Sequence, residues 1–459
     1  MLDWNGFKNT LQHNQVAVFG LGKSGLSTIK ALVENEITVV AWDDDPEKQE
    51  QANKLGADIK DLTKIGLSNF DYLILSPGVP YTFNPHPVVD NAHQYECAII
   101  GDVELLHLLK IPTQTIGITG TNGKSTSTAL MTHILNECGL KAKEAGNIGI
   151  PVLDLEWKDK LDFLVLELSS YQLDLTPSFR PDYSILLNIS PDHLDRHGSM
   201  KAYVESKSII LDGTGVGVVD IDDDFAQVLF DKFFLEGKRK YIPVSVFHEV
   251  PEGFFVKNDN LYQNHLGENQ ELANLSDLPS LKGHHNYQNI VCCIVTGLQI
   301  GLDLNQMVEA LKTFPGLPHR QFVVSSQSQI TFINDSKATN AEAAAKALSS
   351  YENIYWIAGG RAKENGLQGL EIFKDKVIKT FLIGEAEENF AQFLLKNNFE
   401  VMICHDLENA TKQAYESAKN DNNPSTILLS PACASWDQFS SFEERGDAFT
   451  SYVQELVKV

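Results

Sequence analysis

The sequence predicts an α/β fold of three domains, and three observations support this prediction. Short apolar strands alternate with helical segments along most of the 459 residues. Two glycine-rich turns, one near residue 20 and one near residue 120, each follow a strand and open a helix. The proline and glycine cluster at Pro315–Pro318 is typical of a linker. We therefore expect domains at 1–103, 104–316 and 317–459.

The composition is that of a globular chain and argues against several classes of protein. The net charge of −24 argues against nucleic-acid binding, which needs a basic surface. The six cysteines include no CxxC pair, so we expect a reducing compartment rather than a disulfide framework or a zinc site. No apolar run approaches the roughly 18 residues of a membrane span, and the first residues lack the pattern of a signal peptide. These features predict a cytoplasmic protein that binds neither nucleic acid nor membrane.

The first domain is predicted from alternating strands and helices and from one glycine-rich turn. Its strands are Val16–Phe19, Thr38–Ala41, Tyr72–Leu75 and Cys97–Ile100. The turn Gly20-Leu-Gly-Lys-Ser-Gly25 follows the first strand, and Asp43 lies 23 positions after Gly20. This spacing suits a dinucleotide fold in which the acidic residue binds a ribose hydroxyl, and Ser76-Pro-Gly78 can close the same pocket. Any nucleotide diphosphate fits such a helix N-terminus, and a purely structural turn is the alternative.

The central domain is predicted from a phosphate-binding loop, Ile118-Thr-Gly-Thr-Asn-Gly-Lys-Ser-Thr126. A strand at 115–119 precedes the loop, and a helix at 127–136 follows it, with Gly139 at the C-terminal end. Its glycines allow amide groups to face phosphate oxygens, Lys124 can reach the terminal phosphates, and Ser125 or Thr126 can bind Mg²⁺. The common pattern has its first glycine where this chain has Ile118, so we assign the loop to a variant class that binds ATP.

Polar residues follow two further strands of the central domain. Glu167 ends the strand 163–168, and His193 follows the strand 183–189. Since ligands gather at the carboxyl ends of parallel strands, both side chains should approach the phosphate loop, with Glu167 as the natural Mg²⁺ ligand. Asp192 and Asp195 are alternative metal ligands, or they are only turn and cap residues. Lys207 lies in a helix that Ser199 can cap, and its spacing alone indicates no more than a solvated surface charge.

The rest of the chain carries weaker signals. Residues 213–280 are acidic and hairpin-like, and a helix should follow 283–286. Asn286 and Asn289 lie three apart, so both amides can face one ligand, although surface or capping roles explain them equally well. Arg320, just past the linker, can reach a phosphate or form a surface ion pair.

The third domain is predicted from strands at 330–333, 354–357, 380–383 and 426–429. The string Asn334-Asp-Ser-Lys-Ala-Thr339 follows the first of these strands and precedes a helix at 341–348. Its hydroxyls and the helix N-terminus can hold a carboxylate. The alternative is that Thr339 or Asn340 only caps the helix. Lys363, and Ser435 with Phe442, follow two other strands. Three such loops at one sheet edge predict a pocket.

Several strings together resemble the Mur ligases, and the resemblance covers nearly the whole chain in order. They are Gly117-Ile-Thr-Gly-Thr-Asn-Gly-Lys-Ser-Thr126, Gly146-Asn-Ile-Gly149, Leu166-Glu-Leu-Ser-Ser-Tyr-Gln172, Asp192-His-Leu-Asp-Arg-His197, Gly283-His-His-Asn286, Leu317-Pro-His-Arg320, Asn334-Asp-Ser-Lys-Ala-Thr339 and Ser430-Pro-Ala-Cys-Ala-Ser435. The last two strings resemble the family member that adds D-glutamate, rather than its sister ligases or folylpolyglutamate synthetase.

The resemblance implies a fold, a reaction and a cellular role. The fold would be a Rossmann-like N-terminal domain, a central P-loop ATPase-type domain and a Rossmann-like C-terminal domain. The reaction would join D-glutamate to UDP-N-acetylmuramoyl-L-alanine, with conversion of ATP to ADP and phosphate, in bacterial peptidoglycan synthesis. An acyl phosphate would be the intermediate. The partners would be these small molecules alone, and we expect a monomer.

The resemblance also implies the residues of each site. The uridine substrate would be bound by Lys23, Ser24, Asp43, Gly78, Asn147, Ser169, Ser170 and Gln172. ATP would be bound by Gly120, Thr121, Asn122, Gly123, Lys124, Ser125, Thr126, Asn286, Asn289, Arg320 and Asp335. D-Glutamate would be bound by Lys337, Thr339, Lys363, Ser435 and Phe442. Two Mg²⁺ ions would be held by Ser125, Glu167, His193 and a carbamylated Lys207, and Lys124, His193 and Lys207 would be catalytic.

One position departs from the family pattern. The family usually has an acidic residue or glycine just before the lysine that corresponds to Lys363, and this chain has Ala362. Two alternatives outside the ligases are a nucleotide-dependent oxidoreductase, which only the turn at Gly20–Gly25 favours, and a P-loop regulatory ATPase that binds a partner.

Overall fold

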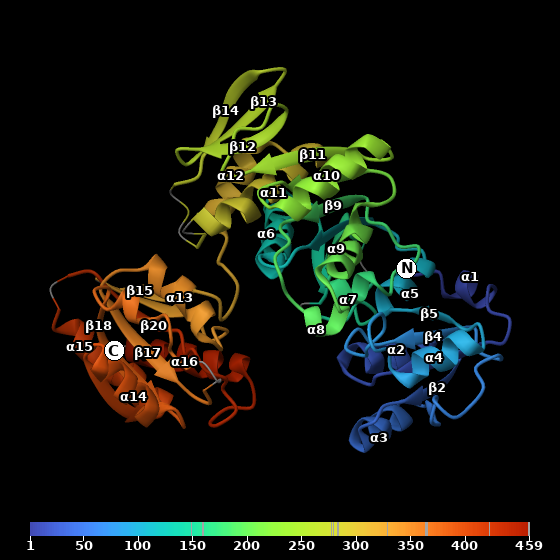
Figure 1. Ribbon diagram of the computed structural model, residues 1–459, viewed down its shortest axis with the longest axis horizontal. Helices are drawn as coiled ribbons and strands as arrows, with labels where there is room; N and C mark the ends of the chain where they lie inside the picture. Colours follow the sequence, from blue (N-terminus) through green and yellow to red (C-terminus); the bar gives the residue numbers. More distant parts are fainter. Residues whose placement is uncertain are drawn as a thin grey trace. The chain divides into compact units, whose positions relative to one another are not determined.

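The computed structural model describes residues 1–147, 149–157, 160–276, 278, 280–281, 284–327, 329–362, 366–421 and 423–457. The chain forms two compact units, Met1–Asp277 with His284–Leu311, and Leu278–Gly283 with Lys312–Val459. The first unit contains two sheets and the second contains one (Figure 1). These three sheets confirm the predicted α/β class, whereas the domain boundaries at 103/104 and 316/317 stay predictions.

The first sheet is entirely parallel, in the order β3-β2-β1-β4-β5. Its strands are β1 (Gln15–Phe19), β2 (Thr38–Trp42), β3 (Asp58–Ile59), β4 (Tyr72–Leu75) and β5 (Ala98–Ile100). The helices are α1 (Trp4–Lys8), α2 (Lys23–Glu34), α3 (Pro46–Lys54), α4 (Pro87–Gln94) and α5 (Asp102–Leu108). Val18 of β1 shares a core with Leu32 of α2, and the next residue, Phe19, shares another with Val89 of α4. Both faces of the sheet are therefore covered by helices.

The second sheet has the order β14-β13-β12-β11-β10-β9-β6-β8-β7. Its strands are β6 (Gln114–Thr119), β7 (Ala142–Gly146), β8 (Phe163–Glu167), β9 (Tyr183–Leu186), β10 (Val216–Asp220), β11 (Lys240–Ser245), β12 (Gly253–Lys257), β13 (Asn260–His265) and β14 (Glu268–Asn274). The helical segments are α6 (Lys124–Glu137), α7 (Ser170–Leu173), α8 (Leu194–His197), α9 (Met200–Ser208), η1 (Ile209–Leu211), α10 (Asp224–Glu236), α11 (His284–Ile300) and α12 (Leu304–Thr313). Strand β6, which leads into the phosphate loop, lies between β8 and β9.

The segment 213–280 differs from the expectation of a series of hairpins. Strands β10 and β11 are parallel neighbours joined by α10, and antiparallel pairing begins only at β12 and β13. The acidic run before α10 caps this helix, because the side chain of Asp223 accepts a hydrogen bond from the amide of Ala226. The prediction was wrong for 216–245 because aspartates are typical both of turns and of the first residues of a helix, so the sequence does not distinguish the two.

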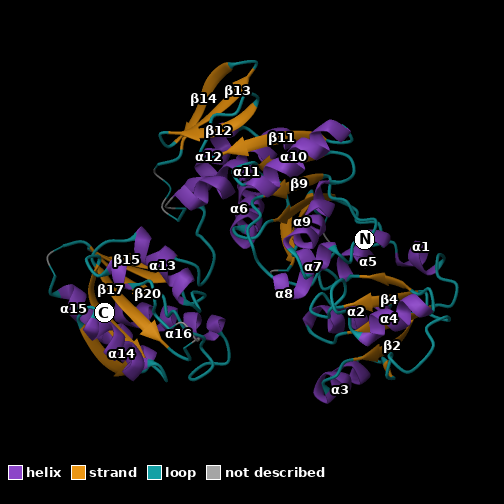
Figure 2. Ribbon diagram, in the orientation of Figure 1, coloured by secondary structure: helices purple, strands orange, loops and turns teal. Residues whose placement is uncertain are grey.

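The second unit contains a sheet in the order β15-β16-β20-β17-β18-β19. Its elements are β15 (Phe322–Gln327), β16 (Ile330–Asn334), α13 (Ala341–Ser350), β17 (Ile354–Gly359), η2 (Glu371–Phe373), β18 (Val377–Ile383), α14 (Glu387–Lys396), β19 (Val401–His405), α15 (Leu407–Lys419), β20 (Ser425–Leu429) and α16 (Phe442–Val457). Trp356 shares a core with Leu394 of α14, whereas its neighbour Ile357 shares another core with Ala414 of α15. Helices thus pack on both faces of this sheet too (Figure 2).

No described helix is long and apolar enough to cross a membrane. All six cysteines are free thiols, and five of them are buried.

Candidate active site

The phosphate loop connects β6 to α6, as predicted. Gly123 is the N-cap of α6 and has φ 84°, in the left-handed region that favours glycine. A Cβ on Gly123 would lie 2.3 Å from Oδ1 of Asn289, so a side chain at this position would collide with α11. The loop therefore needs glycine both for its backbone conformation and for close packing.

The segment after β9 holds the loop in place. The amide of Thr121 donates to the carbonyl of Asn188, and the amide of Asn122 donates to Oδ1 of the same asparagine (2.8 Å). The hydroxyl of Thr121 lies 3.0 Å from the hydroxyl of Tyr203, on α9. Asn188 also donates to Oε1 of Gln288, on α11 (2.6 Å). Three elements thus fix the loop before any nucleotide binds, which is the preorganisation that phosphate binding exploits.

Two lysines donate to one carbonyl oxygen of the loop. Nζ of Lys124 lies 2.9 Å from the oxygen of Gly120 and 2.8 Å from that of Thr121. Nζ of Lys207 lies 2.8 Å from the same Gly120 oxygen and 4.7 Å from the ring centroid of Tyr203. Lys207 is only 1% exposed. Burial, and then the charge of Lys124, hold the pKa of Lys207 well below its usual range.

The paired asparagines lie beside the phosphate loop. Asn289 is buried, and its Oδ1 accepts a hydrogen bond from the hydroxyl of Ser127 (3.0 Å). Its Nδ2 donates to Oδ1 of Asn286 (3.3 Å). The two amides therefore form a pair next to Gly123, where the sequence predicted an ATP contact.

Glu167 supplies a buried carboxylate at the end of β8. Its Oε1 accepts a hydrogen bond from Nδ2 of Asn147 (2.8 Å), whereas its Oε2 is buried and has no hydrogen-bond partner among the described residues. An orphaned carboxylate oxygen fits the donor set that Mg²⁺ prefers. Among the described residues, no three His, Cys, Asp or Glu side chains cluster closely enough to hold a metal ion. A complete metal shell would need other ligands, such as phosphate oxygens, water or a modified lysine.

His193 lies at the start of α8, in a left-handed backbone conformation with φ 52°. Its ring is partly exposed, lies 3.4 Å from Oδ2 of Asp192 and contacts the ring of Tyr171. Such a conformation is uncommon for a residue with a side chain and is often found at functional sites. Asp192 is not part of any metal-binding cluster among the described residues, and Asp195 lies in the first turn of α8.

The serines and glutamine after β8 have structural contacts. The side chains of Ser169 and Gln172 form a reciprocal capping box at the start of α7. The hydroxyl of Ser170 lies 2.9 Å from Nε2 of the buried His197, whose pKa burial lowers to about 4. Of these predicted sugar-site residues, Ser169 is the more exposed one, and Ser170 and Gln172 are buried.

The edge of the first sheet brings together the predicted uridine-site residues. Gly20 and Ser24 follow β1, Asp43 follows β2, and Gly78 follows β4, and these three strands are neighbours. The hydroxyl of Ser76 donates to the carbonyl of Gly20 (2.6 Å). Lys23 and Gly78 are exposed.

Asp43 is already engaged with the glycine turn. Its Oδ2 accepts a hydrogen bond from the amide of Leu21 (2.6 Å), and its Oδ1 accepts from the amide of Asp45. The carboxylate therefore fixes the turn at the position where a dinucleotide fold usually binds a ribose hydroxyl.

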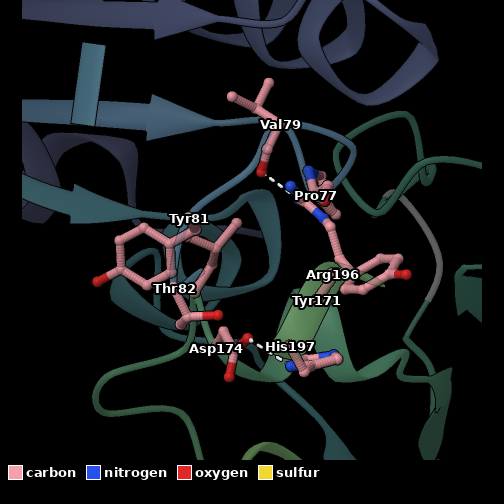
Figure 3. A pocket seen from close by; sticks show the side chains of 9 residues that line it. Pro77, Val79, Tyr81, Thr82, Tyr171, Asp174, Arg196 and His197 are labelled. Carbon is pink, nitrogen blue, oxygen red and sulfur yellow. Dashed lines mark hydrogen bonds and ion pairs between the residues drawn. The ribbon is translucent and has the colours of Figure 1, made fainter. Parts of the chain in front are cut away.

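Arg196 links this edge to the central sheet's loops. Its Nη2 donates to the carbonyls of Pro77 (3.0 Å) and Val79, and its guanidinium lies 5.0 Å from the ring centroid of Tyr171. Figure 3 shows these side chains around a small pocket with Asp174 and His197. The contact ties the loop at Gly78 to α8, three residues after His193.

In the second unit, a buried carboxylate joins the loops that follow the adjacent strands β16 and β20. Asp335 follows β16, and its Oδ2 accepts a hydrogen bond from the hydroxyl of Ser430, which follows β20 (2.7 Å). Burial raises the pKa of Asp335 to about 7, while the charge of Arg320 opposes this shift. The hydrogen bond between Ser430 and Asp335 thus joins two of the predicted loops.

The predicted D-glutamate residues lie around the same loops. Asn340 caps α13 by accepting a hydrogen bond from Ala343, so the hydroxyl of Thr339 is not the cap. Nζ of Lys337 lies 4.8 Å from the ring centroid of Phe442, at the start of α16. Ser435 is 2% exposed. Lys363 lies outside the described residues.

Sequence reasoning missed four residues that hold these loops, namely Asn188, Arg196, Tyr203 and Arg445. Their side chains contact loops distant in the sequence, so no local spacing indicated them. Two of them could have been found from the sequence. Tyr203 lies one helical turn before Lys207, and Arg196 lies in the same string as His193.

Comparisons with known proteins agree with this geometry. The N-terminal domain of MurD-like Mur ligases matches residues 14–101, and the Mur ligase middle domain matches residues 118–297. UDP-N-acetylmuramoylalanine–D-glutamate ligase of Rhizobium meliloti (strain 1021) is 44% identical over 450 residues, which cover 96% of each chain. The enzyme of that name from Phenylobacterium zucineum (strain HLK1) is 41% identical, covering 99% of this chain and 98% of its own.

Solved structures share the fold at low sequence identity. UDP-N-acetylmuramate-alanine ligase MurC from Thermotoga maritima is 17% identical, covers 96% of this chain and 99% of its own, and has a TM-score of 0.58. A UDP-N-acetylmuramoyl-L-alanyl-D-glutamate–2,6-diaminopimelate ligase is 16% identical, covers 100% of this chain and 94% of its own, and has a TM-score of 0.59. The two family models and the full-length relatives show that the chain belongs to the Mur ligase family, in its MurD-like branch.

Proposed function

We propose that this protein joins D-glutamate to UDP-N-acetylmuramoyl-L-alanine, with conversion of ATP to ADP and phosphate, in peptidoglycan synthesis. The observation that carries this proposal is the 44% identity over 96% of the chain to an enzyme named for this reaction. The predicted ATP loop and the orphaned carboxylate of Glu167 support it independently, because they suit magnesium-dependent phosphoryl transfer.

The proposed reaction has two steps. The alanyl carboxylate attacks the γ-phosphorus of ATP, so the γ–β phosphate bond breaks, ADP leaves and an acyl phosphate forms. The amine of D-glutamate then attacks the acyl carbon, losing a proton as the amide forms and phosphate leaves. A carboxylate and a triphosphate repel each other, so the first step needs neutralisation of charge as well as alignment.

The phosphate loop supplies part of this neutralisation. Lys124 donates to two carbonyls of its own loop, and we propose that its Nζ also binds the γ-phosphate of ATP. We propose that the amides at the start of α6 bind phosphate oxygens and that the hydroxyl of Ser125 or Thr126 binds the metal ion. Bound Mg²⁺ would supply further charge neutralisation at the transferring phosphoryl group.

Lys207 suits the proposed role only in modified form. A free ammonium would repel a metal ion, whereas a carbamate offers anionic oxygens. Carbamylation requires an uncharged amine, whose nitrogen bonds to the carbon of CO₂ with release of a proton. Burial lowers the pKa of Lys207 and so favours the uncharged amine. We propose that carbamylated Lys207, Glu167 and His193 are protein ligands for Mg²⁺, with two ions bound in the working enzyme.

The substrates are assigned to the remaining sites. We assign the uridine nucleotide to the edge of the first sheet, around Lys23, Ser24, Asp43 and Gly78, and the sugar with its alanyl group to Asn147, Ser169, Ser170 and Gln172. On the second unit we assign Arg320 and Asp335 to ATP, and Lys337, Thr339, Lys363, Ser435 and Phe442 to D-glutamate. We further propose that the protein is a cytoplasmic monomer.

The test measures ADP release by the purified protein with UDP-N-acetylmuramoyl-L-alanine, with and without D-glutamate. We expect sustained release only with both substrates, and an amide product that contains one D-glutamate. L-Glutamate and glycine are the matched controls for the amino acid. ADP release that does not depend on the uridine substrate would refute the proposal and indicate a regulatory ATPase instead.

A further inference from the structure

A buried histidine lies where three helices of the candidate active site meet. His197 is the last residue of α8, and its side chain is 1% exposed. Its ring stacks on Tyr171 of α7, with ring centroids 5.5 Å apart, and contacts Tyr203 of α9 at 5.3 Å. Helix α7 carries residues assigned to the sugar and its alanyl group, α8 follows His193, and α9 carries Lys207. His197 therefore links the helices that carry the proposed substrate and metal residues.

Two of these helices depend on side-chain contacts for their orientation. Helices α7 and α8 have four residues each. A helix of this length is not stable by itself in water, so contacts with the rest of the protein must fix its direction. A side chain that joins α7, α8 and α9 thus helps to set where their functional residues lie.

The two ring nitrogens of His197 have different partners. Nε2 lies 2.9 Å from the hydroxyl of Ser170, the first residue of α7. Nδ1 lies 3.4 Å from the hydroxyl of Ser206, which precedes Lys207 on α9. Nδ1 also lies 3.8 Å from Oδ2 of Asp174, and Figure 3 shows this carboxylate facing the ring. One nitrogen is thus within hydrogen-bond reach of α7 and the other of α9.

The partners of Nδ1 decide which nitrogen carries the proton. The hydroxyl of Ser206 donates to the carbonyl of Ala202 (3.0 Å), so towards Nδ1 it can only accept. Burial raises the pKa of Asp174 to about 6, against a hydrogen bond from Ser206, so this carboxyl is largely ionised at neutral pH and is also an acceptor. Burial lowers the pKa of His197 to about 4, so the ring is neutral and has one proton. With acceptors around Nδ1, the proton belongs there, and Nε2 accepts the hydroxyl proton of Ser170.

We propose that His197 is a positioning residue with two separable roles: Nε2 accepts a hydrogen bond that holds α7 for the uridine substrate, and Nδ1–H donates one that holds α9, and with it Lys207, for catalysis. This inference rests on the proposed function, because the roles of α7 and α9 come from it. His197 acts through these helices, and it is not assigned contact with the substrate or a metal ion.

Two variants separate the two nitrogens. The side-chain amide of asparagine reaches the position of Nδ1, and that of glutamine reaches the position of Nε2. His197→Asn therefore keeps a donor for Ser206, whereas His197→Gln keeps an acceptor for Ser170. The matched controls are His107→Asn and His107→Gln, because His107 lies on α5, where its ring contacts Phe179 outside the assigned sites. ADP release gives kcat and the KM values for the uridine substrate and for ATP, and thermal unfolding shows that each variant is folded.

The two variants should differ in which kinetic constant changes. For His197→Asn we expect KM for the uridine substrate to rise about 10-fold with little change in kcat, because the hydroxyl of Ser170 loses its acceptor. For His197→Gln we expect kcat to fall about 10-fold with little change in that KM, because α9 loses its donor and Lys207 is displaced. KM for ATP and both His107 variants should stay close to wild type. Equal changes in the two His197 variants, or no change in either, would overturn the two separable roles.

A second measurement tests the position of the proton without using activity. The protein has thirteen histidines, and in protein labelled with ¹⁵N-histidine the ring of His197 is assigned from its contacts with the rings of Tyr171 and Tyr203. We expect the ¹H–¹⁵N spectrum at neutral pH to show a protonated Nδ1 and an unprotonated Nε2. A proton on Nε2 would overturn the proposal even where the variants fail to fold. Failure of the wild-type protein to ligate D-glutamate would refute the proposed function and leave this spectrum unchanged, so the two failures are distinguishable.

Discussion

Two buried basic side chains, one in each unit, are held in opposite ways. Lys207 and Arg445 are each 1% exposed, and neither is paired with a carboxylate among the described residues. Lys207 has a single acceptor, the Gly120 carbonyl that Lys124 also uses. Arg445 donates three hydrogen bonds to two loops.

The difference follows from the chemistry of the two groups. An amine can release its proton when it is buried, and burial does hold the pKa of Lys207 well below its usual range. A guanidinium stays charged, and even the burial of Arg445 lowers its pKa only to about 10. The lysine is therefore suited to reaction as a nucleophile, and the arginine is suited to organising carbonyls by a permanent charge.

The largest expected effect is the loss of ligation in Lys207→Ala. Removal of the amine removes the proposed carbamate, so we expect turnover to fall about 10³-fold or more. Acetate added to the assay should restore part of the activity, because its oxygens can replace those of the carbamate. ADP release measures both effects.

A matched control for this variant lies on the same helix. Lys201 of α9 is exposed and forms only a weak ion pair with Glu205. Lys201→Ala should retain wild-type turnover. Full turnover in Lys207→Ala without acetate would remove Lys207 from the reaction.

The second effect is on stability in the other unit. Arg445→Met leaves buried carbonyls of Ser336 and Cys433 without donors, so we expect the free energy of unfolding of the second unit to fall by about 2–4 kcal/mol. Urea denaturation measures the change. Arg361→Met removes an exposed ion pair with Glu385 in the same unit and should change stability much less. An equal loss of unfolding free energy in both variants would mean that the three hydrogen bonds of Arg445 stabilise the unit no more than the exposed ion pair does.

The sequence predicted the parts of the site that depend on local spacing. Strand, glycine turn and helix occur together at Gly20–Gly25 and at Gly120–Gly123, because each glycine turn is fixed by its own backbone. Glu167 was placed at a strand end for the same reason. The parallel order of strands then brings such ends together without any further information.

The contacts across long sequence separations could not be predicted in this way. The guanidinium of Arg445 reaches loops 109 and 12 positions away, and Arg196 reaches a loop more than 100 positions away. Their partners are backbone carbonyls, which every residue type provides, so the sequence at the acceptor carries no signal. Burial of Lys207 was likewise hidden, because its helix carries a mixed pattern of polar and apolar residues.

The third expected effect is a gain in stability. A buried amine that is neutral in the folded protein and charged in the unfolded chain lowers stability at neutral pH. Lys207→Met removes this penalty and keeps the volume of the side chain, so we expect the free energy of unfolding of the ligand-free protein to rise by about 1–2 kcal/mol, at the expense of activity. Urea denaturation in buffer free of CO₂ measures the change. A less stable variant would mean that the hydrogen bond to Gly120 outweighs the burial of the amine.

The smallest effect is the pH dependence of that gain, and it separates the two basic side chains most directly. The unfolded chain binds a proton at Lys207 up to a pKa of about 10.4, whereas the folded protein has released it at lower pH. Wild-type stability therefore rises with pH between the folded and unfolded pKa values of Lys207, so the advantage of Lys207→Met should shrink as the pH is raised from about 7 to about 9. Arg445, with a pKa of about 10, keeps its proton in both states over this range, so the deficit of Arg445→Met should stay constant. Urea denaturation of all three proteins across this range measures both differences, and a constant gap for Lys207→Met would show that the buried amine is charged in the folded protein.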